Sequence, residues 1–148
     1  MTSGRNISRP VSGLLLGAGI VLMALAAHAK AGTKALHCTF EAGAAWTYTA
    51  GKFKPQKMHR LAFVIADVDM QRQTAKLVTD KGEVQLKTVQ AVNARHFIEV
   101  ASAGFLNLTT VYDKDETTGR FPAIHSRHFG VLGQALVSQF RGSCLEKA

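Results

Sequence analysis

Short runs of β-branched and aromatic residues recur from Leu36 onward, and turn-forming residues separate them at intervals of about eight to twelve residues. This spacing is typical of an all-β sandwich or barrel. The clearest hairpin is residues 76–89, where Asp80-Lys81-Gly82 forms the turn. Residues 133–140 fit either a strand or one short helix. The predicted strands span residues 36–41, 45–50, 60–68, 73–79, 83–91, 95–101, 106–112, 121–128 and 132–141.

The only two cysteines, Cys38 and Cys144, lie near the two ends of this β region. In an oxidising compartment, two such cysteines are most simply joined in one disulfide. Because bonded cysteines need Cα atoms within about 7 Å, the first and last strands would then lie side by side. We therefore expect a small antiparallel β-barrel, or a sandwich with stapled edges, of about eight strands.

The first 29 residues differ in kind from the rest of the chain. Arg5 and Arg9 precede an uncharged apolar run that ends in Ala27-His28-Ala29. This order predicts a signal peptide, residues 1–29, cleaved after Ala29, whereas the alternative is an uncleaved membrane anchor. Cleavage leaves residues 30–148, the size of a single domain, in a periplasmic or secreted protein.

Removal of the leader leaves 16 Lys and Arg against 10 Asp and Glu, a net charge of +6. This balance favours anionic partners such as lipid headgroups, an acidic polysaccharide or an acidic protein. Nucleic acid is not expected, because the basic residues do not alternate with aromatic residues. The basic residues concentrate in residues 51–60, which we interpret as a loop that contacts a membrane surface or an acidic partner, or is simply solvated. They are Lys52, Lys54, Lys57 and Arg60.

Residues 121–130, FPAIHSRHFG, place two histidines, an arginine and a serine among apolar residues. On a regular strand His125 and His128 point to opposite faces, so they do not share a metal ion. If Ile124 faces the core, Ser126 and His128 line the interior together with His96 from another strand, although a slip of one residue inverts the assignment. The predicted ligand-binding residues are therefore His96, Ser126 and His128, and the predicted surface residues in this segment are His125 and Arg127.

No stretch contains a specific catalytic, metal or cofactor motif. Ser126 has no nucleophile elbow or oxyanion glycines, and the histidines lack a metal-ligand spacing. We expect an exported, monomeric binding protein without enzyme activity, cofactor or metal, which holds a small apolar or amphipathic ligand or an anionic envelope component. Two alternatives are a secreted inhibitor-like module acting through the hairpin tip at residues 113–119, and a small metal-dependent or acid–base enzyme using His96 and His128.

The segment FEAGAAWTYTAGKF, residues 40–53, contains Gly43-x-x-Trp46 on an early strand, and Arg141 lies near the end of the last one. This arrangement resembles lipocalins and related calycins, which pair an early Gly-x-Trp with a late arginine. Here one more residue separates the glycine from the tryptophan. The resemblance implies a barrel in which Arg141 packs on the Trp46 ring, a cation–π contact worth ~0.5–2 kcal/mol.

Overall fold

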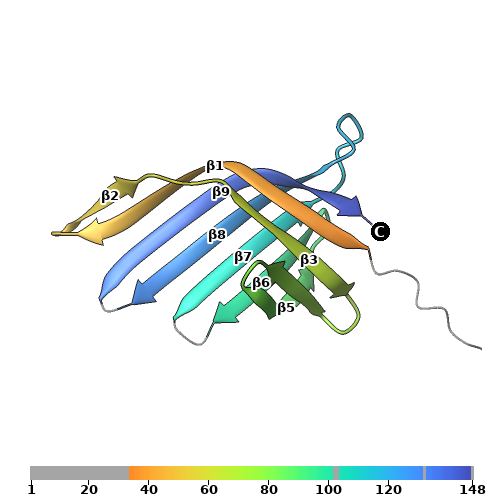
Figure 1. The fold of residues 1–148 in the computed structure, drawn as a ribbon, viewed down its shortest axis with the longest axis horizontal. Helices are drawn as coiled ribbons and strands as arrows, with labels where there is room; N and C mark the ends of the chain where they lie inside the picture. Colours follow the sequence, from red (N-terminus) through yellow and green to blue (C-terminus); the bar gives the residue numbers. More distant parts are fainter. Residues whose placement is uncertain (1–33, 102–103, 132, 148) are drawn as a thin grey trace, which may run out of the picture.

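The computed structural model describes residues 34–101, 104–131 and 133–147, which form one curved antiparallel sheet (Figure 1). The strand order is β2-β1-β3-β4-β5-β6-β7-β8-β9, and β1 also pairs with β9. Eight strands therefore close a barrel, and β2 is an extra strand, which confirms the predicted all-β class and the barrel rather than the sandwich. The strands are β1 (Ala35–Thr49), β2 (Lys52–Gln56), β3 (Leu61–Asp69), β4 (Thr74–Thr79), β5 (Gly82–Gln90), β6 (Ala94–Ala101), β7 (Phe105–Tyr112), β8 (Phe121–Val131) and β9 (Gln134–Lys147).

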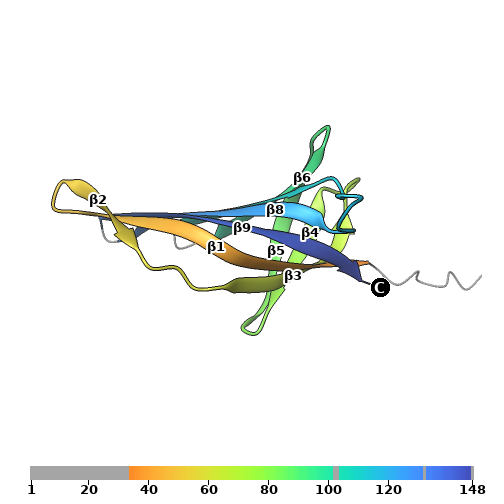
Figure 2. The same ribbon diagram turned by 90° about the horizontal axis from the view of Figure 1, so that it is seen from above.

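The long strand β1 pairs with three other strands. Its first half pairs with β3 over Leu36–Phe40, its second half pairs with β2 over Ala45–Thr49, and β9 follows its other edge almost throughout. A bulge at Glu41, between Phe40 and Ala42, marks the change of partner. The second half of β1 therefore leaves the closed ring and projects from it with β2, as Figures 1 and 2 show.

Two sequence predictions change at the strand ends, and the strand predicted at 132–141 is confirmed and extended. The two strands predicted at 36–41 and 45–50 are one continuous strand, β1. The predicted basic loop at 51–60 contains the short strand β2, which pairs with the edge of β1 that β3 has left. Residues 134–140 belong to β9 rather than to a helix, and that strand runs on to Lys147.

Cys38 and Cys144 form the predicted disulfide, and they are direct partners in the β1–β9 register. A disulfide is consistent with an oxidising, exported location. The predicted signal peptide, residues 1–29, lies outside the described residues. Among the residues that are described, no helix is long and apolar enough to cross a bilayer.

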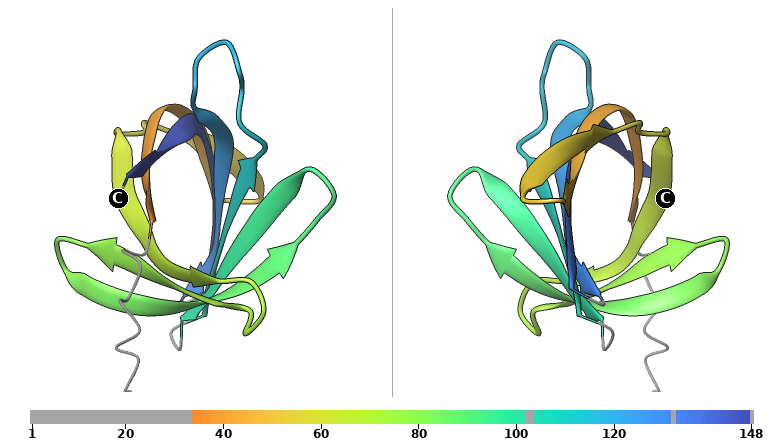
Figure 3. Two further views of the ribbon diagram at one scale, coloured as in Figure 1. Left: turned by 90° about the vertical axis from the view of Figure 1, so that its right-hand side faces the viewer. Right: turned by 90° about the vertical axis from the view of Figure 1, so that its left-hand side faces the viewer.

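The hydrophobic core fills the half of the barrel around the disulfide. Phenylalanine rings dominate it, with Phe40 and Phe63 in contact at 5.3 Å between ring centroids. These residues come from the half of β1 before the bulge and from the strands that complete the ring, seen from its two ends in Figure 3. The projecting end of the sheet, formed by β2 and the second half of β1, therefore contributes no residue to this core. The core residues are Leu36, Cys38, Phe40, Phe63, Ile65, Ala75, Leu86, Phe97, Val111, Ala123, Phe140 and Cys144.

Candidate functional site

The face assignment predicted for β8 is wrong by one residue. His125 is only 3% exposed and Ala123 is buried, whereas His128 is exposed on the outside of the barrel. Pairing with β9 explains the inversion, because it sets Ala123 opposite Gly142 and His125 opposite the buried Phe140. Ala123 and the His125 imidazole thus face the interior, which the phenylalanine side chains fill. His125 and Arg127 are therefore interior residues rather than surface residues.

The predicted ligand-binding residues lie on the outer face. The ring of His96 forms a hydrogen bond with Thr110 (Nδ1 to Oγ1, 3.0 Å), and Gln139 Nε2 donates to Ser126 Oγ at 3.4 Å. His128 lines a shallow outer groove beside Phe53. The geometry therefore does not bring these three residues together around an internal site.

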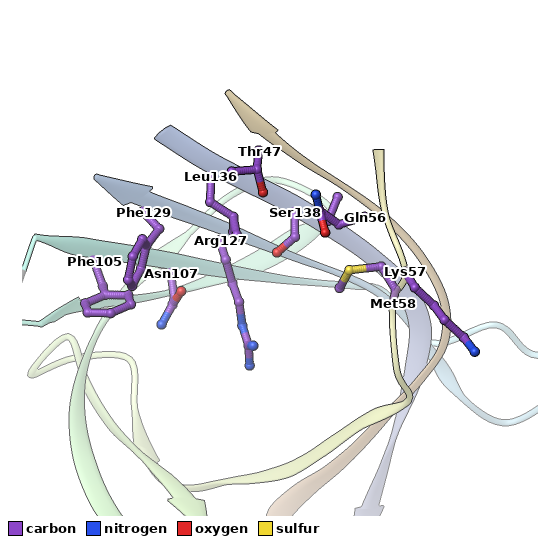
Figure 4. A pocket seen from close by; sticks show the side chains of 11 residues that line it. Thr47, Gln56, Lys57, Met58, Phe105, Asn107, Arg127, Phe129, Leu136 and Ser138 are labelled. Atoms are coloured by element: carbon purple, nitrogen blue, oxygen red, sulfur yellow. The ribbon is translucent and has the colours of Figure 1, made fainter. Parts of the chain in front are cut away.

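The basic residues predicted at the surface are exposed, as expected for solvated side chains. Lys52 and Lys54 belong to β2, and Lys57 and Arg60 follow in the link to β3. Arg60 Nε contacts Glu41 Oε1 at 3.1 Å, while Lys57 reaches the rim of a cavity (Figure 4). The basic stretch therefore frames the open end of the sheet.

That cavity has a volume of about 520 Å³ and lies on the inner side of the sheet. Its size falls within the roughly 300–1,000 Å³ of small-molecule sites. One wall is aromatic, because the rings of Phe105 and Phe129 meet edge to face at 3.9 Å between centroids. Figure 4 shows the Arg127 side chain extending past these rings toward the interior. The lining residues are Ala45, Thr47, Gln56, Lys57, Met58, Phe105, Asn107, Arg127, Phe129, Leu136 and Ser138.

His125 holds the Arg127 side chain through one hydrogen bond. Arg127 Nε donates to His125 Nε2 at 3.0 Å, which requires that nitrogen to be unprotonated. The proton of the neutral ring therefore sits on Nδ1, which donates to Thr109 Oγ1 at 2.8 Å. Burial, followed by the charge of Arg127, lowers the pKa of His125 to about 3, in agreement with this neutral form. Both ring nitrogens are thus engaged in positioning the arginine.

The guanidinium of Arg127 lies between the cavity and a smaller chamber of about 220 Å³. It stacks over the Phe140 ring at 5.4 Å. Burial lowers the pKa of Arg127, and the charge of Glu99 opposes that effect. Asn107 Nδ2 donates to Glu99 Oε2 at 2.8 Å, and the ion pairs found among the described residues do not include Arg127. The cavity therefore has a half-buried cation at its inner end, and the charge of Glu99 acts on that cation from the adjoining chamber.

Sequence reasoning missed the aromatic wall, although a signal for it was present. Phe129 follows Arg127 by two residues, so both side chains lie on the same face of β8. The register between strands shows that this face is the inner one. Within the described part of the chain, no three His, Cys, Asp or Glu side chains gather in a group that would hold a metal ion.

The stacking implied by the likeness to lipocalins is not present. Trp46 is opposite Val137 and Arg141 is opposite Ala42, which separates them by four positions along β1. The cation–π contacts among the described residues involve Arg95 with Phe121 and Arg127 with Phe140.

Comparison with known proteins gives no match: no family model fits the chain, and no curated protein or solved structure is significantly similar to it.

Proposed function

We propose that this chain is an exported binding protein that holds a small amphipathic acid in the open end of its barrel. The observation that supports this proposal is the half-buried Arg127 guanidinium at the inner end of a largely apolar cavity of about 520 Å³. The proposed export is supported by the disulfide, which forms and persists in oxidising compartments.

The chemistry of the lining supports an amphipathic ligand. Phe105, Phe129 and Leu136 offer apolar surface to a hydrocarbon chain. Arg127 uses its Nε–H in the hydrogen bond to His125, so its terminal N–H groups can donate to a ligand. A carboxylate accepts two such N–H groups in a charge-assisted pair. Partial burial of a cation costs free energy, and an anionic group on the ligand would offset the part of that cost that the charge of Glu99 leaves.

The same geometry favours binding over catalysis. A general base needs a nitrogen or oxygen that is free to take a proton from the substrate. In His125, Nε2 accepts from Arg127 and Nδ1 donates to Thr109, so the ring acts as a support. Arg127 is itself a poor proton acceptor, because its guanidinium stays protonated in proteins.

Calorimetric titration with dodecanoate and with 1-dodecanol, which share a chain length, tests this proposal. We expect dodecanoate to bind more tightly than the alcohol. Arg127→Gln should weaken dodecanoate binding about 10- to 100-fold, the loss of a hydrogen-bonded charge pair worth ~1.5–3 kcal/mol. The variant should leave the affinity for the alcohol nearly unchanged.

Ser126→Ala is the matched control, because Ser126 precedes Arg127 but lies on the outer face of the strand. It should bind dodecanoate like the wild type. Binding of neither compound would refute the proposed cavity ligand, whereas equal binding of both, unaffected by Arg127→Gln, would refute the role of the arginine.

A further inference from the structure

The outer face of the sheet, behind the cavity, has a row of side chains that the register brings into line. The row crosses β7, β8, β9, β1 and β2 in that order, with one residue on each strand. Each residue is the direct cross-strand partner of the next. The row is Leu106, His128, Val137, Trp46 and Pro55, and it contains no Asp, Glu, Lys or Arg. The outer face of the projecting end of the sheet is therefore largely apolar.

Aromatic side chains extend this row onto the β1–β2 hairpin. Figures 1 and 2 show this hairpin projecting from the ring of strands. Trp46 is 39% exposed, Tyr48 is 44% exposed and Phe53 is 56% exposed. Tyr48 and Phe53 are cross-strand partners whose rings meet edge to face at 5.1 Å. Exposed apolar surface that is contiguous in this way marks an interaction site. We call Trp46, Tyr48 and Phe53 the outer aromatic strip.

The segments that build this end of the sheet contain no acidic residue. Residues 42–66, 100–112 and 117–145 have no Asp or Glu, whereas the first of them alone supplies four cations. Lys52 and Lys54 alternate with Phe53 along β2, so ammonium groups and an aromatic ring project from opposite faces of one hairpin. The acidic residues of 113–116 lie at the other end of β7 and β8. Glu99 on β6 pairs with Asn107 beside the cavity, whereas the β1–β2 hairpin itself has charges of positive sign only.

We infer that the outer aromatic strip and the lysines of β2 dock the protein on an anionic lipid bilayer. Trp and Tyr side chains are favoured at the headgroup level of a membrane, where an apolar ring and a polar edge are both satisfied. Lysines near them gain from the negative surface potential of anionic lipids. A hairpin that enters the headgroup layer tip first presents both of its faces to lipid, so the aromatic rings and the ammonium groups act together.

Docking in this orientation goes beyond ligand binding, since it gives the protein a place to exchange its ligand. Lys57 lies at the rim of the cavity and directly follows β2, so the same hairpin borders the cavity and meets the lipid. An amphipathic acid would then move between bilayer and cavity with little exposure of its hydrocarbon chain to water. The docking rests on the exposed hairpin and is measurable whether or not the cavity is filled.

The chain's single tryptophan, Trp46, belongs to the strip and makes the docking directly observable. The experiment adds vesicles of phosphatidylglycerol and phosphatidylcholine to the purified full-length protein and records tryptophan emission. We expect a blue shift with these vesicles, a smaller one at high salt because salt screens exposed charges, and none with phosphatidylcholine alone. Vesicle binding through any distant segment would leave the Trp46 emission unchanged.

Two variants test the two parts of the surface. Phe53→Ser, and the double change Lys52→Glu with Lys54→Glu, should each weaken vesicle binding at least about tenfold. Val92→Ser, which alters a 95% exposed valine in the β5–β6 turn, and Lys114→Glu, in the β7–β8 loop, are the matched controls and should bind like the wild type. Circular dichroism and dodecanoate titration without vesicles check that each variant is folded.

Several results would overturn the inference. An unchanged emission spectrum in anionic vesicles would do so, as would vesicle binding that the β2 variants do not reduce. An equal blue shift with soluble polyglutamate would assign the surface to an acidic protein instead of lipid. Dodecanoate binding with no docking would leave the proposed function standing and remove only the membrane surface.

Discussion

The burial of His125 predicts that mild acid destabilises the barrel. The pKa of this ring is about 3 in the folded protein, against an ordinary value of 6.5. The folded state therefore resists a proton that the unfolded chain accepts, and stability falls as the pH drops from about 6.5 toward 3. Each pH unit in that interval costs about 1.4 kcal/mol, so the loss between pH 8 and pH 5 is about 2 kcal/mol from this residue alone.

The assay is urea denaturation, followed by circular dichroism, at several pH values between 8 and 5. Carboxylates stay largely ionised in this range, which isolates the histidines. His125→Gln keeps an oxygen that accepts from Arg127 Nε but has no titrating group there. This variant should be less stable at pH 8, because the fit is imperfect, and should lose about 2 kcal/mol of the wild-type pH dependence.

His128→Gln is the matched control, since it makes the same change on the exposed face of the same strand. It should retain the wild-type pH dependence. If the free energy of unfolding of the wild type and of His125→Gln falls equally between pH 8 and 5, a neutral buried His125 is not the cause and the hydrogen-bond assignment is wrong.

Three further predictions concern stability. Gly142→Ala should prevent stable folding, because the added Cβ would overlap the Thr39 carbonyl oxygen and lie 2.7 Å from Phe40 Cα. The control, Gly130→Ala, has open space around the added Cβ and should melt like the wild type in a thermal scan. Reduction of the disulfide, or the double change to serine at Cys38 and Cys144, should cost ~4–5 kcal/mol, because the bond closes a loop with a sequence separation of 106; a midpoint of urea unfolding unchanged by a reductant would contradict this. Phe97→Ala removes a ring that is 1% exposed and should cost ~3–5 kcal/mol by urea denaturation, whereas Val84→Ala, at an exposed position, should cost far less.

The local pattern of the sequence determined the strand content, and the two cysteines determined that the ends of the β region meet. Strands separated by short turns pair with their neighbours, and a disulfide between the first and last of them leaves no other arrangement than adjacent ends. These inferences use only spacing and covalent geometry, which do not depend on the register of any strand. For that reason the all-β class and the pairing of Cys38 with Cys144 were predictable, whereas the choice of a barrel over a sandwich came from the structure.

The site depended on information that a single strand does not contain. Alternation divides residues 121–130 into two faces, yet each face has polar and apolar residues, so hydrophobicity alone does not say which is inside. The partner strands decide it, because Ala123 fits against Gly142 while the rings around His125 fill the interior.

The strand β2 and the cavity beside it have a similar origin. A stretch of lysines with Pro55 has weak strand propensity, and it pairs where β3 leaves an edge of β1 open beyond Phe40. Sequence by itself thus determined the all-β class and the disulfide, through the spacing of strands and turns and the short reach of a bonded cysteine pair. Tertiary structure alone decided which side chains face inward and where the sheet projects, because those depend on the register between strands far apart in the chain.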